Sequence, residues 1–161
     1  MKNMKKIVAT FLALGALAMP VSAYAQDQSP VTLKGEVKAV ETSVDEEGNE
    51  TIKLVEPALI VPGDRLMFGT EYANNGAEPA DNFVITNAVP GAVRVAPDAP
   101  ADLTVSVDGG KSWGVLSELT ITNEDGTTRP AKHEDVTHVR WTLASIAPGA
   151  SGRVEYPAII R

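Results

Sequence analysis

Apolar and polar residues alternate along most of the chain, and turn-forming residues interrupt the alternation at short intervals. Clear alternating runs lie at 31–39, 103–108, 138–143 and 153–160. A period of two places the apolar side chains on one face of a strand and the polar ones on the other. Between the runs, Gly, Pro, Asn and Asp gather at 45–49, 62–64, 74–76, 90–91, 108–110, 123–126 and 148–149. The pattern predicts an all-β fold, a two-sheet antiparallel β-sandwich of about seven to nine short strands.

The first and last runs allow more specific predictions. The segment 31–54 is expected to open the sandwich as a long hairpin that turns at 45–49. Pro157 lies inside the last run and cannot donate a backbone hydrogen bond, so its strand is predicted to be an edge strand or to be bulged. Trp141 alternates with Val139 and Leu143 and is expected to fill the space between the sheets.

The first 25 residues have the features of a secretory signal peptide. Three lysines precede an apolar segment at 7–19, and small residues at 23 and 25 mark a cleavage site before Gln26. The apolar segment is shorter than the roughly 20 residues of a membrane-spanning helix. We therefore expect 1–25 to be cleaved, 26–30 to be a short flexible lead-in, and 31–161 to be a single domain in the periplasm or outside the cell. The chain has no cysteine, so its stability must come from packing and backbone pairing.

The charge of the chain restricts its partners. There are 14 basic and 21 acidic residues, a net charge of −7, and loss of three lysines with the leader would bring this to −10. Nucleic acids and anionic membranes attract basic surfaces. We expect no nucleic acid partner and no membrane insertion after cleavage of the leader.

Several turn motifs recur in a set order between 57 and 160. They are Pro62-Gly63-Asp64, Tyr72-x-Asn74-x-Gly76, Pro79-Ala80-x-Asn82-Phe83-Val84-Ile85, Val89-Pro90-Gly91, Ser106-x-Asp108-Gly109-Gly110 and Ile146-Ala147-Pro148-Gly149. In this order they resemble the DUF11-type conserved repeat domain of bacterial surface and exported proteins, in a single copy. The resemblance implies an immunoglobulin-like sandwich that serves as a spacer.

Residues 106–113 also fit the Asp-box pattern S-x-D-x-G-x-T-W, with serine in place of the threonine. Asp108 is expected to accept hydrogen bonds from backbone N–H groups across the turn, while Gly109 and Gly110 adopt positive φ angles. Trp113 is expected to cover the base of the hairpin. Asp boxes recur in sialidases and other β-propellers, but one box cannot build a propeller. We interpret these four residues as a structural turn.

Acidic residues gather at the tip of the predicted first hairpin and are the candidate metal ligands, namely Asp45, Glu46, Glu47 and Glu50. Carboxylate oxygens suit Ca²⁺, but their spacing does not fit an EF-hand loop. A solvated turn is the simpler interpretation of such a charge run.

Catalytic motifs are weak. His133 and His138 are separated by an odd number of positions, which places them on opposite faces of a continuous strand, and the chain has no third histidine. Neither histidine lies in a recognisable catalytic triad with a serine nucleophile. Acidic residues from different loops can meet in space, but no pair is singled out.

The sequence therefore predicts an exported, non-enzymatic structural or protein-interaction module without a cofactor. The expected partner is another exported or envelope protein, docked by β-augmentation on an edge strand. A ligand-binding or Ca²⁺-binding sandwich is the alternative. A hydrolase with an unrecognised carboxylate site is the third hypothesis.

Overall fold

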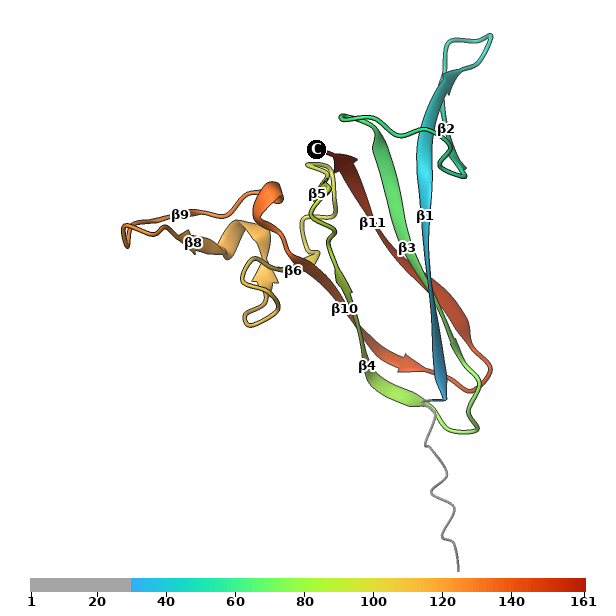
Figure 1. The fold of residues 1–161 in the computed structure, drawn as a ribbon. Coiled ribbons are helices and arrows are strands. Elements are labelled where there is room, and N and C mark those ends of the chain that lie inside the picture. The colour runs from blue at the N-terminus through green and yellow to red at the C-terminus, as the bar shows by residue number, and fades with distance from the viewer. Residues whose placement is uncertain (1–29) are drawn as a thin grey trace, which may run out of the picture.

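Two antiparallel β-sheets pack face to face in the computed structural model, which describes residues 30–161 (Figure 1). The first sheet has five strands in the order β2 (Glu50–Val55), β1 (Val31–Val44), β3 (Arg65–Asn74), β11 (Ser151–Ile160) and β5 (Val93–Val95). The second has four strands in the order β4 (Ala80–Ala88), β10 (His138–Ile146), β6 (Thr104–Ser106) and β7 (Gly114–Val115). The prediction of an all-β, two-sheet antiparallel sandwich is confirmed.

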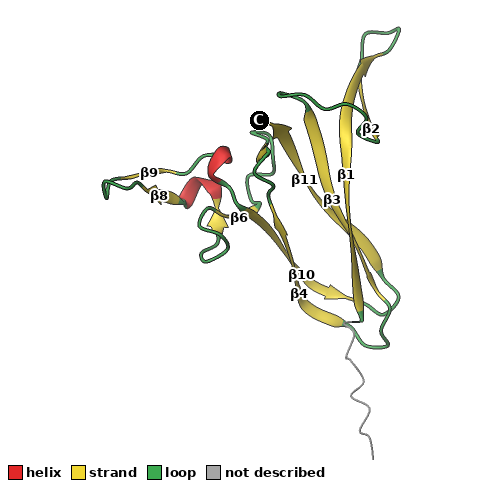
Figure 2. Ribbon diagram, viewed as in Figure 1, coloured by secondary structure: helices red, strands yellow, loops and turns green. Residues whose placement is uncertain are grey.

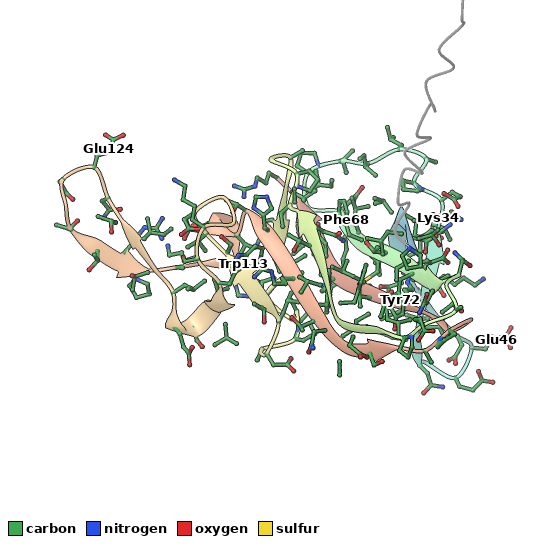
Figure 3. The ribbon with its side chains drawn as sticks, turned by 90° about the horizontal axis from the view of Figure 1, so that it is seen from below. Lys34, Glu46, Phe68, Tyr72, Trp113 and Glu124 are labelled. Atoms are coloured by element: carbon green, nitrogen blue, oxygen red, sulfur yellow. The ribbon has the colours of Figure 1, made fainter. Side chains whose placement is uncertain are left out.

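A third, two-stranded sheet projects from the side of the sandwich. It consists of β8 (Thr120–Thr122) and β9 (Thr128–Pro130). Two short 3₁₀ helices stand at its base, η1 (Leu116–Glu118) before it and η2 (His133–Asp135) after it (Figure 2). The β1–β2 hairpin also projects, and Figure 3 shows Glu46 at its tip and Glu124 at the tip of β8–β9 at opposite ends of the molecule.

The core lies between the two layers, where the inward-facing positions of both sheets meet. Val37, Phe68 and Tyr156 are neighbours across three strands, and the rings of Phe68 and Tyr156 stack with centroids 5.2 Å apart. Trp141 pairs with Ile85 in the other sheet, and its ring centroid lies 6.2 Å from that of Tyr156. Burial of one such side chain contributes about 1.5–3 kcal/mol. Trp141 therefore lies between the sheets, as expected.

Asn74 joins the turn between β3 and β4 to the end of β10. Its side chain is fully buried, and its amide nitrogen donates to the carbonyl oxygens of Glu78 (2.9 Å) and Ile146 (2.8 Å). Its amide oxygen accepts from the N–H of Gly76 at 3.0 Å. One buried side chain thus satisfies three backbone groups, which gives the spacing of asparagine and glycine in this motif a structural reason.

The prediction that Pro157 marks an edge strand is wrong for the strand as a whole. β11 lies between β3 and β5, but β5 pairs only with residues 158–160. The carbonyl oxygen of Pro157 accepts from the N–H of Ala96 at 2.9 Å, just after the end of β5. The proline therefore stands where the second neighbour of β11 ends, and its missing N–H interrupts no ladder.

The predicted signal peptide at 1–25 and most of the lead-in at 26–30 lie outside the described residues. Pro30 opens the described part, and its carbonyl oxygen accepts from the N–H of Asn75 at 2.8 Å. From there to the end of the chain, no helix has the length and apolar character needed to cross a membrane.

Candidate functional site

Asp108 organises the turn between β6 and β7 through both oxygens of its carboxylate. One oxygen accepts from the hydroxyl of Ser106 (2.7 Å) and from the backbone N–H groups of Lys111 and Ser112 (both 2.9 Å). The other accepts from the hydroxyl of Ser112 at 2.6 Å. These hydrogen bonds, above all those from Ser112, hold the pKa of Asp108 well below its usual range. The carboxylate is thereby committed to the turn.

The rest of this motif connects the turn to β10. Gly109 and Gly110 have φ angles of 79° and 87°, which an L side chain rarely adopts. The indole N–H of Trp113 donates to the carbonyl oxygen of Gly110 at 3.0 Å, and the guanidinium of Arg140 lies 3.5 Å from the centroid of the indole ring. The N–H of Gly109 donates to the hydroxyl of Thr137 at 3.1 Å. The geometry is that of a structural turn packed on a strand.

The four acidic candidates are exposed at the tip of the β1–β2 hairpin. Asp45 uses its carboxylate inside the turn, accepting from the N–H groups of Glu47 (3.1 Å) and Asn49 (2.7 Å). The hydrogen bonds from Asn49 are the main reason that the pKa of Asp45 is lowered. Among residues 30–161, no three acidic, histidine or cysteine side chains gather as a metal site. Calcium binding by Asp45, Glu46, Glu47 and Glu50 stays a prediction.

The two histidines occupy different surroundings. His133 begins η2 at the side of a pocket described below. His138 begins β10, where its ring meets that of Trp113 edge-on at 6.2 Å and its Nδ1 lies 3.1 Å from the hydroxyl of Thr137. The structure therefore gives the two imidazoles no shared site.

The β1–β2 hairpin reverses the apolar and polar faces of β1. Up to Ala39, the apolar residues of β1 share the face that turns toward the core. Beyond it, Val40 pairs with Leu54 on the opposite face, and Ile52 and Val44 lie on that same face. The positions that continue the core-facing side carry polar pairs, Glu41 with Lys53 and Ser43 with Thr51. We call Val40, Val44, Ile52 and Leu54 the hairpin face. Thr42, which pairs with Ile52, and Glu50, which pairs with Val44, are the polar residues on the same side.

Three of the four residues of the hairpin face are exposed to solvent, and Val40 is half-buried. Ile52 is 70% exposed, Val44 64% and Leu54 44%. In the loop from β2 to β3, Leu59 is 84% exposed, and the next two residues are also exposed. Of the eight large hydrophobic side chains that are exposed between 30 and 161, six lie between 44 and 61. Concentrated apolar exposure of this kind marks interaction surfaces in soluble proteins.

The alternation at 31–39 predicts a core-facing pattern for the first hairpin and does not by itself reveal this surface. The signal is nevertheless present. Apolar residues occupy the odd positions 31, 33, 37 and 39, and then the even positions 40, 44, 52 and 54. A shift of one residue moves the whole apolar set to the other face of a strand.

A pocket of about 420 Å³ opens between the loop 96–103, η1 and η2. Its floor consists of buried aliphatic residues, namely Val95, Leu103, Val105 and Val136. The polar residues that line it are Ser117, Lys132 and His133. Its walls come from segments that are far apart in the sequence, so no local pattern predicts it.

A second cleft, of about 520 Å³, lies between β1 and β3 on one side and β4 on the other. The side-chain amide of Asn87 crosses it and donates to the hydroxyl of Thr70 at 2.7 Å. Tyr156 is fully buried at this cleft, and within residues 30–161 its hydroxyl has no hydrogen-bond partner. Burial raises the pKa of Tyr156 to about 12. The lining mixes apolar, amide, hydroxyl and carboxylate groups, the last from Glu36, and selects no single ligand chemistry.

Comparison with known proteins gives no match to a family model, to a curated protein or to a solved structure. The resemblance to the DUF11-type domain therefore stays a prediction from the turn motifs.

Proposed function

We propose that this protein is an exported, non-enzymatic interaction module that binds another exported or envelope protein through its β1–β2 hairpin. The hairpin face carries the proposal. An apolar strand face is normally covered by a second layer, whereas Ile52, Val44 and Leu54 remain largely exposed on a projecting hairpin (Figure 1). A partner that covers these side chains supplies the missing layer.

Two further features support this role. Export follows from the predicted signal peptide at 1–25. A non-catalytic role fits the turn around Asp108, whose carboxylate is used by four hydrogen bonds within the motif. The resemblance to repeat domains of bacterial surface proteins agrees with a structural or protein-interaction module.

The charge of the hairpin selects the chemistry of the partner. Five carboxylates lie on or beside it, those of Glu41, Asp45, Glu46, Glu47 and Glu50. Two copies of this chain that met through the same surface would bring these acids together and repel each other. The partner is therefore a different protein, whose docking surface has an apolar centre and a basic rim.

β2 also offers a backbone edge to this partner. It is the terminal strand of the five-stranded sheet and pairs with β1 on one side only. An extended segment of the partner adds to this edge by β-augmentation, with alternate side chains lying beside Ile52 and Leu54. This is the edge docking that the sequence predicts, assigned to one strand.

Affinity capture from the native cells tests the proposal. The full-length chain is tagged and compared as wild type, as Ile52→Ser/Leu54→Ser, and as Thr51→Ala/Lys53→Ala, a matched control on the opposite face of the same strand. One identified exported protein should copurify with the wild type and the control. Its recovery with Ile52→Ser/Leu54→Ser should fall at least about tenfold, because two apolar anchors are lost.

The following outcomes support or contradict docking through the hairpin face. Recovery that weakens between about 0.05 M and 0.5 M salt supports the acidic contribution, since screening grows over that range. Equal recovery with both variants contradicts the proposal, as does copurification of a second copy of this chain alone. The replaced side chains are exposed, so thermal unfolding should be unchanged in both variants and shows that any loss reflects docking.

A further inference from the structure

We propose that the pocket between the loop 96–103, η1 and η2 binds a small, mainly apolar molecule that carries one anionic group. The pocket lies away from the hairpin face. Binding of a small molecule in the pocket therefore does not depend on a partner protein docked on the hairpin face. Its volume of about 420 Å³ falls in the range of about 300–1,000 Å³ that is typical of ligand pockets.

The apolar part of the pocket is rigid and continuous with the core. Its floor residues Leu103 and Val136 are buried members of the core cluster. Pro97 and Pro100 stand in the wall and restrict its backbone. The N–H of Leu103 donates to the carbonyl oxygen of Pro100 at 3.0 Å and closes a turn there. An apolar ligand gains about 25 cal/mol for each Å² of apolar surface that it removes from water here.

The facing wall, residues 131–136, is fixed by hydrogen bonds to other segments. The N–H of Ala131 donates to the carbonyl oxygen of Leu119 at 2.9 Å. The guanidinium of Arg161 donates to the carbonyl oxygen of Glu134 at 2.7 Å. Because both walls are held in this way, a ligand meets a preformed site, and binding loses little conformational entropy.

The charges at the pocket specify the polar end of the ligand. Acidic residues outnumber basic ones by 21 to 14 in the chain, yet the lining contains Lys132 and His133 and no acidic residue. The ammonium of Lys132 lies 3.8 Å from the carboxylate of Glu134, and both side chains are mostly exposed. Such a contact is weak and screened by solvent. The ammonium is therefore free to bind a carboxylate or sulfonate, with Ser117 as an additional donor.

Two fluorescent dyes with the same aromatic skeleton test this inference. N-phenyl-1-naphthylamine is neutral, and 8-anilinonaphthalene-1-sulfonate adds one anionic group. In titrations of the full chain, both should bind at one site, with the anionic dye about tenfold tighter. Lys132→Gln/His133→Gln should lower the affinity for the anionic dye to that of the neutral dye and leave the neutral dye unaffected.

Two plugging variants test the location of the site. Ala101 and Ser117 are exposed lining residues, so Ala101→Trp and Ser117→Phe should have the melting temperature of the wild type. Each variant should abolish binding of both dyes. Ile52→Ser/Leu54→Ser controls for adsorption to the hairpin face and should change neither affinity. The inference is overturned if neither dye binds the wild type, or if binding survives both plugs. It is also overturned if Lys132→Gln/His133→Gln weakens the two dyes equally.

Discussion

Arg129 donates two hydrogen bonds of 2.7 Å from its guanidinium to the two carboxylate oxygens of Asp135. Arg129 stands on β9 and Asp135 in η2, so this bidentate pair fastens the projecting hairpin to the pocket wall that carries Lys132. Asp135 also accepts from the N–H of Lys132 at 2.8 Å. The hydrogen bonds from Arg129 are the main reason that the pKa of Asp135 is lowered.

Asp135→Asn should reduce the free energy of unfolding by about 1–2 kcal/mol, between the values for exposed and buried ion pairs. The Asp135 side chain is only 14% exposed, whereas that of Arg129 is 37% exposed. Glu134→Gln is the matched control, because it removes an exposed contact of 3.8 Å and should cost less than about 0.5 kcal/mol. Denaturant unfolding measures the loss of free energy of unfolding in both variants. Equal losses would show that the bidentate pair of Arg129 and Asp135 stabilises the protein no more than an exposed ion pair does.

Asn74→Ala should destabilise the protein by about 2–3 kcal/mol, because it leaves the carbonyl oxygens of Glu78 and Ile146 without their donor. The neighbouring Asn75→Ala is the control. The side chain of Asn75 is exposed and donates only to the hydroxyl of Thr32 at 3.1 Å, so its loss should cost less than about 0.5 kcal/mol. If both variants lose a comparable free energy of unfolding in chemical denaturation, the buried side-chain amide of Asn74 does not hold the turn between β3 and β4 to the end of β10.

Asp108 should link stability to pH. Its folded pKa lies below the ordinary value of 3.8 because Ser112 and Ser106 donate to the carboxylate. Such a group contributes its full stabilisation above its unfolded pKa and loses it as the pH falls toward the folded pKa. Asp108→Asn should therefore melt below the wild type at pH 7, and the difference should shrink progressively below about pH 4.

Thermal unfolding followed by circular dichroism from neutral to acidic pH checks this dependence. Glu124→Gln, at the exposed tip of β8–β9, is the control and should leave the wild-type profile unchanged. If the difference in melting temperature between Asp108→Asn and the wild type stays constant across the pH range, the lowered pKa of Asp108 does not link stability to pH.

Gly69 allows Arg153 to cross the outer face of β3. Arg153 stands on β11 and pairs with Glu36 on β1 and with Glu155. A Cβ at Gly69 would clash with the guanidinium of Arg153, so Gly69→Ala should displace the end of this flexible side chain, weaken its ion pairs and destabilise the protein by only about 0.5–1 kcal/mol. In an Arg153→Ala background the same change should cost little, with a coupling of at least about 0.5 kcal/mol in a double-mutant cycle. Additive effects would show that the two residues act independently.

The parts of the fold that depend on local chemistry could be predicted from the sequence. Alternation indicates which residues share a strand face, so the sandwich is predictable from the sequence. The Asp108 turn is also predictable, because the hydrogen bonds of the Asp108 carboxylate all close within residues 106–113. The edge-strand prediction for Pro157 is wrong because the second neighbour of β11 is β5, a strand of only three residues that carries no alternation of its own.

The candidate surfaces depend on relationships that alternation alone does not report. The pocket is built from segments between 95 and 136 that meet only in the folded chain. The hairpin face depends on the shift of the apolar set from Ala39 to Val40, which is visible in the sequence but acquires meaning only when the core is known to end there. Interaction surfaces of this kind follow from what the fold leaves uncovered.

Photocrosslinking from two neighbouring positions of β2 tests the proposed docking most directly. Ile52 lies on the hairpin face, whereas Lys53 pairs with Glu41 on the opposite face. A p-benzoylphenylalanine at either position in the full-length chain is activated in the native cells. Position 52 should give a discrete adduct with one exported protein that carries a basic, apolar docking surface, and position 53 should give little or none. Equal adducts from both positions, an adduct only with a second copy of this chain, or none from position 52 would contradict docking through the hairpin face.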